Sequence, residues 1–253
     1  MILTIDAGNS RTKWGVFDSA GELKAHGVMA NSVLSGATAP ADWPQCTRAI
    51  ISNVAGASIA AHVSRLLEPL TIPVHWVKSS AHACEVTNSY QLPERLGTDR
   101  WAALIAAWHQ YRAPCVVVNA GTALTVDALG ANGGGQGTFL GGLIVPGLRL
   151  MEQSLISAAA DISHISGALQ YFPTTTGDAI YTGALSAMAG AVNSMLVKLA
   201  LNAGQQPYCI LSGGDASLLQ DMLIRYQVEN IVIAENLVLQ GLQLLEKEMG
   251  KGA

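Results

Sequence analysis

The sequence has no long hydrophobic run, no cluster of basic residues and little charge of either sign. Its 253 residues include 14 Lys or Arg and 18 Asp or Glu, for a formal net charge of −4. Proteins that bind nucleic acid or anionic membrane surfaces usually carry a basic patch, so we expect neither partner. Because half of the residues are hydrophobic and only 13% are charged, the composition is typical of a compact globular protein.

Segments that could act as membrane or export signals are also lacking. The most apolar helical stretch, residues 183–201, is interrupted by Asn193 and Lys198, so we expect no membrane span. The first residues have no basic leader and no small-residue cleavage site, and Asp6 lies where a signal peptide needs its apolar centre. These features together predict a cytoplasmic protein.

Cysteine and histidine are scarce and scattered. None of the four cysteines belongs to a C-x-x-C pair, and the six histidines do not cluster near them, which argues against a zinc site. We expect the cysteines to be reduced and buried, as is usual in a reducing compartment. They are Cys46, Cys84, Cys115 and Cys209.

One short pattern occurs twice along the chain. Residues 5–10 read IDAGNS, and residues 118–123 read VNAGTA. Each copy follows an apolar run and leads into a second strand-like segment, at residues 13–17 and 124–129. Two copies of strand, polar turn and strand indicate a duplicated α/β unit. We place the domain boundary near Pro114, which gives predicted domains at residues 1–113 and 114–253.

The remaining segments alternate between strand and helix, as α/β folds require. Residues 177–203 are rich in Gly and Ala on several faces, so this long helix is expected to pack closely against a neighbouring element or another subunit. Thr98 is a candidate N-cap for the helix over 99–111. Strands are expected within 48–53, 73–79, 125–129, 138–143, 208–212 and 231–234, a hairpin tip at 133–137, and helices over 62–70, 99–111, 177–203, 216–223 and after 236.

The polar turn DAGNSRTK, residues 6–13, has the parts of a phosphate site. A glycine turn lets backbone amides approach an anion, and Asp6 can hold Mg²⁺ through water. An ordinary hairpin turn with a polar tip explains the same residues. The second copy at 119–127 favours the phosphate site, because two matched turns that faced one another would clamp a phosphate from both sides.

Three further motifs each allow two interpretations. In GTDR, residues 97–100, Asp99 could receive a proton from a substrate hydroxyl with Arg100 near an anionic group, or the acid could simply complement the helix dipole. SGGDA, residues 212–216, suits either a flat adenine against bare backbone or a strand-to-helix turn. Thr174, Thr175 and Thr176 fit an N-cap cluster or a ligand contact.

Six segments in this order and spacing resemble type III pantothenate kinases. They are DAGNSRTK, GTDRWAALIAAW, NAGTALTVD, GGLIVPG, TTTGDAIYTG and SGGDA, and the resemblance runs from residue 2 to about residue 245. Each segment is unspecific alone, but six in register are strong evidence. The resemblance implies the fold of the acetate and sugar kinase, Hsp70 and actin superfamily. In that α/β fold two duplicated ribonuclease-H-like domains, with mixed sheets flanked by helices, bind nucleotide in the cleft between them.

The family activity that this resemblance implies is ATP-dependent phosphorylation of pantothenate to 4′-phosphopantothenate, the first step of coenzyme A biosynthesis. Asp99 matches the proton acceptor, and Asp6 lies near Mg²⁺. The matching substrate-binding residues are Tyr90, Gly97, Thr98, Asp99, Arg100 and Thr176, the last reaching across a homodimer. The matching ATP contacts are Asp6, Ala7, Gly8, Asn9, Ser10, Arg11, Thr12, Lys13 and Thr122. Gly213 and Gly214 of SGGDA are further candidate ATP contacts.

One position departs from the family pattern. Members commonly use a monovalent cation, K⁺ or NH₄⁺, bound by an aspartate that opens the second turn, where this chain has Asn119. An amide oxygen brings no charge, so the cation is expected to bind more weakly or to be dispensable. Two rival functions remain: a kinase for another small hydroxylated acceptor, and a nucleotide-binding regulatory or accessory protein with Asn119 as the sign of a decayed site. The intact Asp6, Asp99 and Arg100 count against decay.

Overall fold

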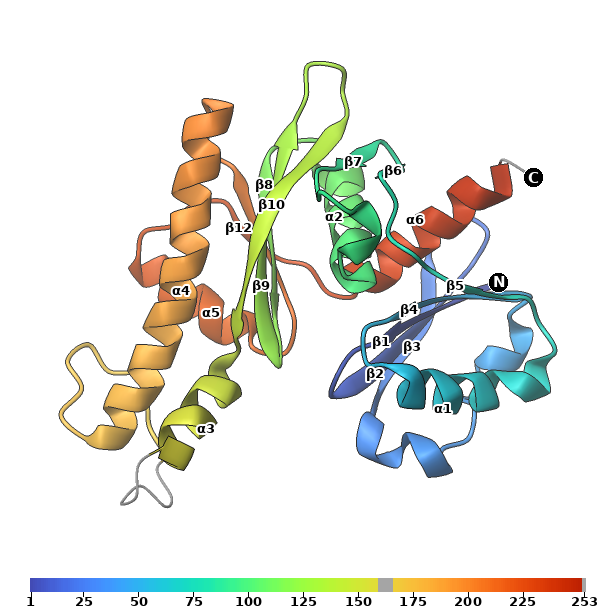
Figure 1. Ribbon diagram of the computed structural model, residues 1–253, viewed down its shortest axis with the longest axis horizontal. Helices are drawn as coiled ribbons and strands as arrows, with labels where there is room; N and C mark the ends of the chain where they lie inside the picture. The colour runs from blue at the N-terminus through green and yellow to red at the C-terminus, as the bar shows by residue number, and fades with distance from the viewer. Residues whose placement is uncertain (159–165, 252–253) are drawn as a thin grey trace. The chain divides into compact units, whose positions relative to one another are not determined.

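The computed structural model describes residues 1–158 and 166–251, and the chain divides into two units. Unit 1 comprises Met1–Tyr111 with Asn236–Ala253, and unit 2 comprises Arg112–Glu235. Figure 1 shows the chain coloured from its N-terminus to its C-terminus. The expected boundary near Pro114 lies close to this division. The closing helix α6 (Leu237–Lys251) was assigned to the second domain, but it belongs to unit 1, where it packs along another helix.

A mixed sheet forms the centre of unit 1. Its strand order is β3-β2-β1-β4-β5, in which β1 is antiparallel to β2 and parallel to β4. The predicted strands on either side of the first polar turn are confirmed, whereas β3 was not among the predicted elements. The strands are β1 (Ile2–Ala7), β2 (Arg11–Phe17), β3 (Leu23–Ala30), β4 (Arg48–Asn53) and β5 (Val74–Trp76).

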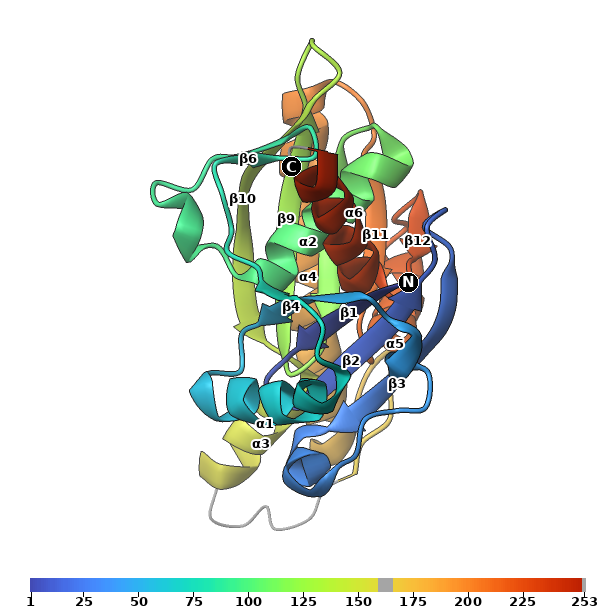
Figure 2. The same cartoon turned by 90° about the vertical axis from the view of Figure 1, so that its right-hand side faces the viewer.

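Helices cover both faces of this sheet. On one face α1 (Ala57–Leu67) buries Val63 in a core that includes Leu3 and Ile5 of β1. Because side chains alternate along a strand, Asp6 faces the other side, where α2 (Thr98–Tyr111) and α6 lie side by side, as Figures 1 and 2 show. A Cβ on Gly241 of α6 would lie 1.9 Å from the Ala102 carbonyl oxygen of α2, so only glycine allows this close approach.

Short elements complete unit 1. The hairpin of β6 (His82–Ala83) and β7 (Val86–Asn88) precedes α2 and is antiparallel. Short segments of 3₁₀-helix occur at η1 (Asn31–Gly36), η2 (Trp43–Gln45), η3 (Glu68–Leu70) and η4 (Pro93–Arg95).

Unit 2 repeats the strand pattern of unit 1. Its strands follow the order β12-β11-β8-β9-β10, in which β8 is antiparallel to β9 and parallel to β11. The first strand of each unit is therefore paired in the same way, as the duplicated IDAGNS and VNAGTA segments predicted. The strands are β8 (Cys115–Ala120), β9 (Ala123–Ala131), β10 (Gly137–Pro146), β11 (Tyr208–Ser212) and β12 (Ile231–Ile233).

The described residues of unit 2 include three helices: α3 (Leu148–Ala158), α4 (Thr176–Ala203) and α5 (Ala216–Arg225). In Figure 1, α4 runs along one face of the sheet, where Met188 and Val192 join its core. Despite Asn193 and Lys198, α4 reaches a mean hydropathy of 1.5, and among the described residues it is the one helix long and apolar enough to cross a membrane. This finding rests on length and composition alone, and the core helix of a soluble protein passes the same test, so the expectation of no membrane span stays a prediction.

None of the four cysteines forms a disulfide. Cys46, Cys115 and Cys209 are buried as expected, and burial raises the pKa of each of these thiols. Cys84 differs, because it is half-buried in the tight turn between β6 and β7, where its φ is 48°.

Candidate active site

The predicted site residues fall into two groups, one in each unit, and each group is described by itself. Unit 1 contributes the segment 6–13, Tyr90 and the segment 97–100. Unit 2 contributes Asn119, Thr122, Thr176, Gly213 and Gly214.

The first polar turn connects β1 to β2 as a hairpin. Asp6 is paired with Lys13 and Ala7 with Thr12 across the two strands, and the Gly8 N–H donates to the Arg11 carbonyl at 3.1 Å. Asn9, Ser10 and Arg11 at the tip are exposed. The turn therefore presents its polar residues to solvent at the carboxyl end of β1.

Asn31 supports this turn from the end of β3. Its Oδ1 accepts a hydrogen bond from the Thr12 hydroxyl at 2.9 Å, and its Nδ2 donates to the carbonyls of Gly8 at 2.7 Å and Asn9 at 3.0 Å. Thr12, one of the predicted ATP contacts, is fully buried, and its hydroxyl donates its hydrogen bond to Asn31 and not to a ligand. Asn31 was missed by the sequence analysis, because a lone asparagine after an edge strand carries no recognisable pattern.

Asp6 lies in an environment that disfavours its charge. Burial and the negative charge of Asp99 raise the pKa of Asp6 to about 7, although Lys13 partly opposes this shift. Its Oδ1 is buried without a hydrogen-bond partner. An unpartnered carboxylate oxygen fits a hydrated Mg²⁺, which takes oxygen ligands, keeps several waters and is usually held by one or two carboxylates plus substrate phosphates. Within residues 1–158 and 166–251, no group of three or more His, Cys, Asp or Glu suited to a metal occurs.

Asp99 lies in the first turn of α2. The Trp101 N–H donates to the Gly97 carbonyl at 2.9 Å, so Gly97 precedes the helix and Thr98 is the first helical residue, not the predicted N-cap. Asp99 Oδ1 accepts a hydrogen bond from the Arg100 backbone N–H at 2.8 Å. Burial raises the pKa of Asp99, against the lowering effect of that N–H and of the Arg100 charge.

The glycine before the helix makes room for this carboxylate. A Cβ on Gly97 would lie 2.6 Å from Asp99 Oδ1, which is too short for any non-bonded contact. The side chain of Asp99 could therefore not keep its position beside a residue larger than glycine.

Arg100, the residue that follows Asp99, contacts Tyr90. Arg100 is buried, and its Nη1 donates to the Tyr90 hydroxyl at 3.0 Å. The Tyr90 segment is itself held by Asn88, whose Nδ2 donates to the carbonyls of Ser80 and Pro93 and whose Oδ1 accepts from the Tyr90 N–H. The structure thus joins two predicted substrate-binding residues that are ten positions apart in the sequence.

In unit 2, Asn119 is the next-to-last residue of β8 and lies directly opposite Ser212 of β11. Gly213 follows with φ of +99°, and a Cβ there would lie 2.2 Å from the Ala120 carbonyl oxygen and 2.7 Å from Asn119 Oδ1. Only glycine fits, so the SGGDA turn brings its bare backbone against Asn119. Gly214 has open space where a Cβ would point.

Thr122 is exposed at the tip of the second turn. Its carbonyl accepts a hydrogen bond from the Gly147 N–H at 3.0 Å. This bond attaches the turn to the segment that follows β10, so the tip is supported by protein on one side.

Thr175 and Thr176 have different positions at the start of α4. Thr175 is the N-cap, and its Oγ1 accepts from the Asp178 N–H at 3.2 Å. Thr176 is the first helical residue and is exposed. Capping therefore accounts for Thr175 but leaves the side chain of Thr176 available.

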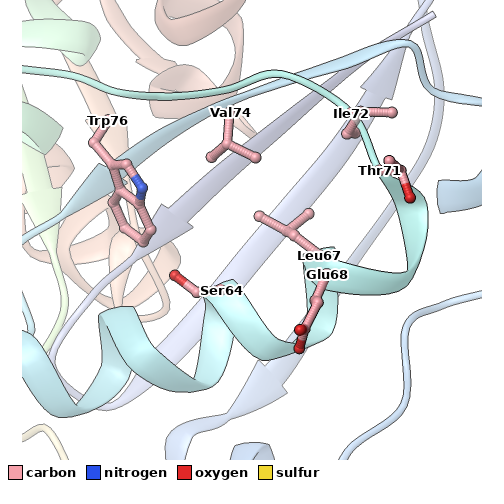
Figure 3. A pocket seen from close by; sticks show the side chains of 7 residues that line it. All are labelled: Ser64, Leu67, Glu68, Thr71, Ile72, Val74 and Trp76. Carbon is pink, nitrogen blue, oxygen red and sulfur yellow. The ribbon is translucent and has the colours of Figure 1, made fainter.

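A shallow hollow of about 180 Å³ lies elsewhere in unit 1, between α1 and β5 (Figure 3). It contains none of the predicted site residues. Its lining consists of Ser64, Leu67, Glu68, Thr71, Ile72, Val74 and Trp76.

Solved structures with low sequence identity share this fold. A Baf family protein from Campylobacter jejuni matches with a TM-score of 0.60 at 20% identity, over 98% of this chain and 99% of its own. An activator of 2-hydroxyisocaproyl-CoA dehydratase from Clostridium difficile, solved with bound ADPNP, matches with a TM-score of 0.54 at 10% identity, over 99% and 94%. These likenesses concern the fold alone, and they agree with the predicted α/β fold of mixed sheets flanked by helices.

Sequence comparison gives the family. The family model for type III pantothenate kinase matches residues 2–198. A type III pantothenate kinase from Methylobacillus flagellatus is 47% identical over 97% of this chain and 98% of its own length. The chain therefore belongs to the type III pantothenate kinase family.

Proposed function

We propose that this protein transfers the γ-phosphoryl group of ATP to the primary hydroxyl of pantothenate, which gives ADP and 4′-phosphopantothenate in the first step of coenzyme A biosynthesis. Membership of the kinase family supports this reaction. The observation that carries it is the pair of shielded carboxylates, Asp6 and Asp99, which interact on one face of the unit 1 sheet. A phosphoryl transfer site needs one carboxylate for the metal and one for the nucleophile.

Asp99 is the residue that orients the attacking hydroxyl. The Arg100 N–H holds one carboxylate oxygen, Oδ1, so the orientation of the carboxylate is fixed. Phosphoryl transfer passes through a loose transition state, and the hydroxyl proton leaves late. A carboxylate of modest basicity is sufficient for that late transfer, and the raised pKa of Asp99 makes it a better acceptor than an exposed aspartate.

Asp6 and the adjacent turn form the proposed phosphate side of the site. If Mg²⁺ is held here, it would supply positive charge that neutralises part of the negative charge of the phosphates. Asp6 provides the carboxylate oxygen for it, Lys13 lies opposite Asp6 on the neighbouring strand, and the exposed turn from Asn9 to Arg11 supplies donors. In unit 2 we assign Thr122, which is exposed at the tip of the second turn, as a further ATP contact, together with Gly213 and Gly214, whose SGGDA turn carries no side chain at these positions.

Tyr90 and Arg100 are the proposed pantothenate contacts beside Asp99. Because the Arg100 side chain is buried, the position of its positive charge is fixed. The hydrogen bond to Tyr90 holds the two side chains in one arrangement. Such a pair can orient an anionic substrate so that its hydroxyl approaches Asp99.

A second copy of the chain is the proposed partner, and it would bring Thr176 to the substrate. In the described residues α4 is apolar on several sides, and its Leu201 is 81% exposed. Tyr171 and Phe172 just before α4 are exposed by 82% and 80%. Exposed apolar area of this kind favours an interface. We assign the protein to the cytoplasm, because its proposed substrates are cytoplasmic metabolites and none of its four cysteines forms a disulfide.

The experiment that tests this function is an acceptor panel. Purified protein with ATP and Mg²⁺ is assayed for ADP release with pantothenate, with sugars and with hydroxy acids. We expect release with pantothenate at least a hundredfold faster than with any other acceptor. If ADP is released faster with another acceptor, that acceptor is the substrate instead of pantothenate. If the protein binds ATP but turns over no acceptor, the regulatory function is favoured.

A further inference from the structure

Asn31 holds the first polar turn by four hydrogen bonds, three of which use its side chain. Its Nδ2 donates to the carbonyls of Gly8 and Asn9, and its Oδ1 accepts from the Thr12 hydroxyl. Its own backbone N–H donates to the Ser10 carbonyl at 3.0 Å. A residue from the end of β3 therefore binds almost every position of the turn.

These contacts determine which way the peptide groups of the turn face. In a trans peptide the C=O and the N–H of the same unit point in opposite directions. The carbonyls of Gly8 and Asn9 point toward the Asn31 amide, so the N–H groups of Asn9 and Ser10 point away from it. Carbonyl oxygens repel phosphate oxygens, whereas N–H groups attract them.

An amide is the side chain that suits this position. Two donors face two carbonyls and one acceptor faces a hydroxyl, so the orientation of the Asn31 amide is specified by its partners. A carboxylate of the same shape would keep the contact with Thr12 but place a second oxygen against the two carbonyls.

We propose that Asn31 is a positioning residue of the nucleotide site: it holds the carbonyls of Gly8 and Asn9 back so that the N–H side of the turn, with the Asn9 N–H, faces the phosphates of ATP. Asn31 does not touch the reacting atoms and acts through the turn. The inference rests on the proposed function in that ATP is the ligand of this turn.

The test compares Asn31→Asp with Asn88→Asp. Both changes are isosteric, and both remove two donated bonds to backbone carbonyls in unit 1, but Asn88 supports the Tyr90 segment instead of the turn. For Asn31→Asp we expect the KM for ATP and the Kd for ADP to rise at least tenfold, with the KM for pantothenate within twofold of wild type. For Asn88→Asp we expect the opposite pattern.

Several outcomes would overturn the inference. If Asn31→Asp changes the KM for both substrates equally, or lowers the Tm without changing nucleotide affinity, Asn31 is only structural. If Asn31→Asp does not fold, Asn31→Ser carries the same test, because serine is too short to reach both carbonyls. Calorimetric ADP binding separates the two proposals: if wild type binds ADP but phosphorylates no pantothenate, the function fails while the ADP measurement still decides the role of Asn31.

Discussion

The hydroxyls of Ser52 and Thr98 lie 2.8 Å apart and share a hydrogen bond. Ser52 is in β4 directly beside Asp6 of β1, and Thr98 is the first residue of α2, immediately before Asp99. This bond therefore connects the strand neighbour of one carboxylate to the sequence neighbour of the other. The spacing of Asp6 and Asp99 depends on how α2 is attached to the sheet, and Ser52 provides a direct attachment.

Replacement of Ser52 by alanine should loosen that attachment. We expect Ser52→Ala to lower kcat by about tenfold, since small displacements of a reacting group have large effects on rate, and to cost about 1 kcal/mol of stability. Steady-state kinetics and thermal melting measure both quantities. The control is Ser80→Ala, which removes a local hydroxyl bond to the His82 carbonyl at an exposed position. Equal kcat values for Ser52→Ala and wild type would show that the bond does not position Asp99.

Gly97→Ala is a second test of the position of the Asp99 carboxylate. The new Cβ would lie 2.6 Å from Asp99 Oδ1, so the carboxylate must rotate away from its bond with the Arg100 N–H. We expect kcat to fall by about a hundredfold while the Kd for ADP stays within twofold. Gly36→Ala is the matched control, because a Cβ there meets no atom within 4 Å. Normal turnover in Gly97→Ala would mean that Asp99 has more room than its contacts indicate.

The raised pKa of Asp6 predicts a specific pH dependence. Because the folded-state pKa of about 7 exceeds the ordinary value of 3.8, protonated Asp6 favours the folded state at low pH, and this contribution is lost as pH rises from about 4 to 7. In metal-free protein we expect the free energy of unfolding of wild type, relative to Asp6→Asn, to fall by about 1.4 kcal/mol per pH unit over that window.

Urea unfolding at half-unit pH steps, in the presence of a chelator, measures this difference. Addition of Mg²⁺ above pH 7 should restore part of the lost stability to wild type and none to Asp6→Asn. Parallel pH profiles for the two proteins would show that Asp6 has an ordinary pKa and no special place in the site.

Asn119 predicts weak dependence on monovalent cations. Its amide oxygen can coordinate K⁺ but contributes no charge, so we expect exchange of K⁺ for Na⁺ to change kcat/KM by less than about threefold. Asn119→Asp should increase the stimulation by K⁺ or NH₄⁺ to about tenfold or more. If wild type is inactive without K⁺, the expectation that an asparagine at position 119 weakens the dependence on the cation is contradicted.

Much of the fold followed from the sequence because the apolar strands and the glycine turns are local signals. The duplicated unit was visible as IDAGNS and VNAGTA, and both copies form a hairpin whose first strand is also paired in parallel. The place of α6 was not visible, since the contact of Gly241 with Ala102 joins segments far apart in the chain.

The site was predictable only in part, for a similar reason. Asp6 and Asp99 lie in recognisable motifs, whereas Asn31 and Ser52 are connected to the site by hydrogen bonds to residues far away in the sequence. Thr98 appeared to be an N-cap because threonine often is one, but its hydroxyl bonds to Ser52 instead of capping α2. Local sequence propensity contains no information about a hydrogen-bond partner that lies 46 positions away in the sequence.

The formation of 4′-phosphopantothenate by wild type and by Asp99→Asn, followed by mass spectrometry with ATP and Mg²⁺, tests the central claim most directly. We expect wild type to form the product and Asp99→Asn to form it about 10² to 10⁴ times more slowly, with unchanged ADP affinity. The control Asp18→Asn removes a surface pair with Lys24 and should leave the rate unchanged. Absence of product with wild type, or an equal rate in Asp99→Asn, would contradict the account.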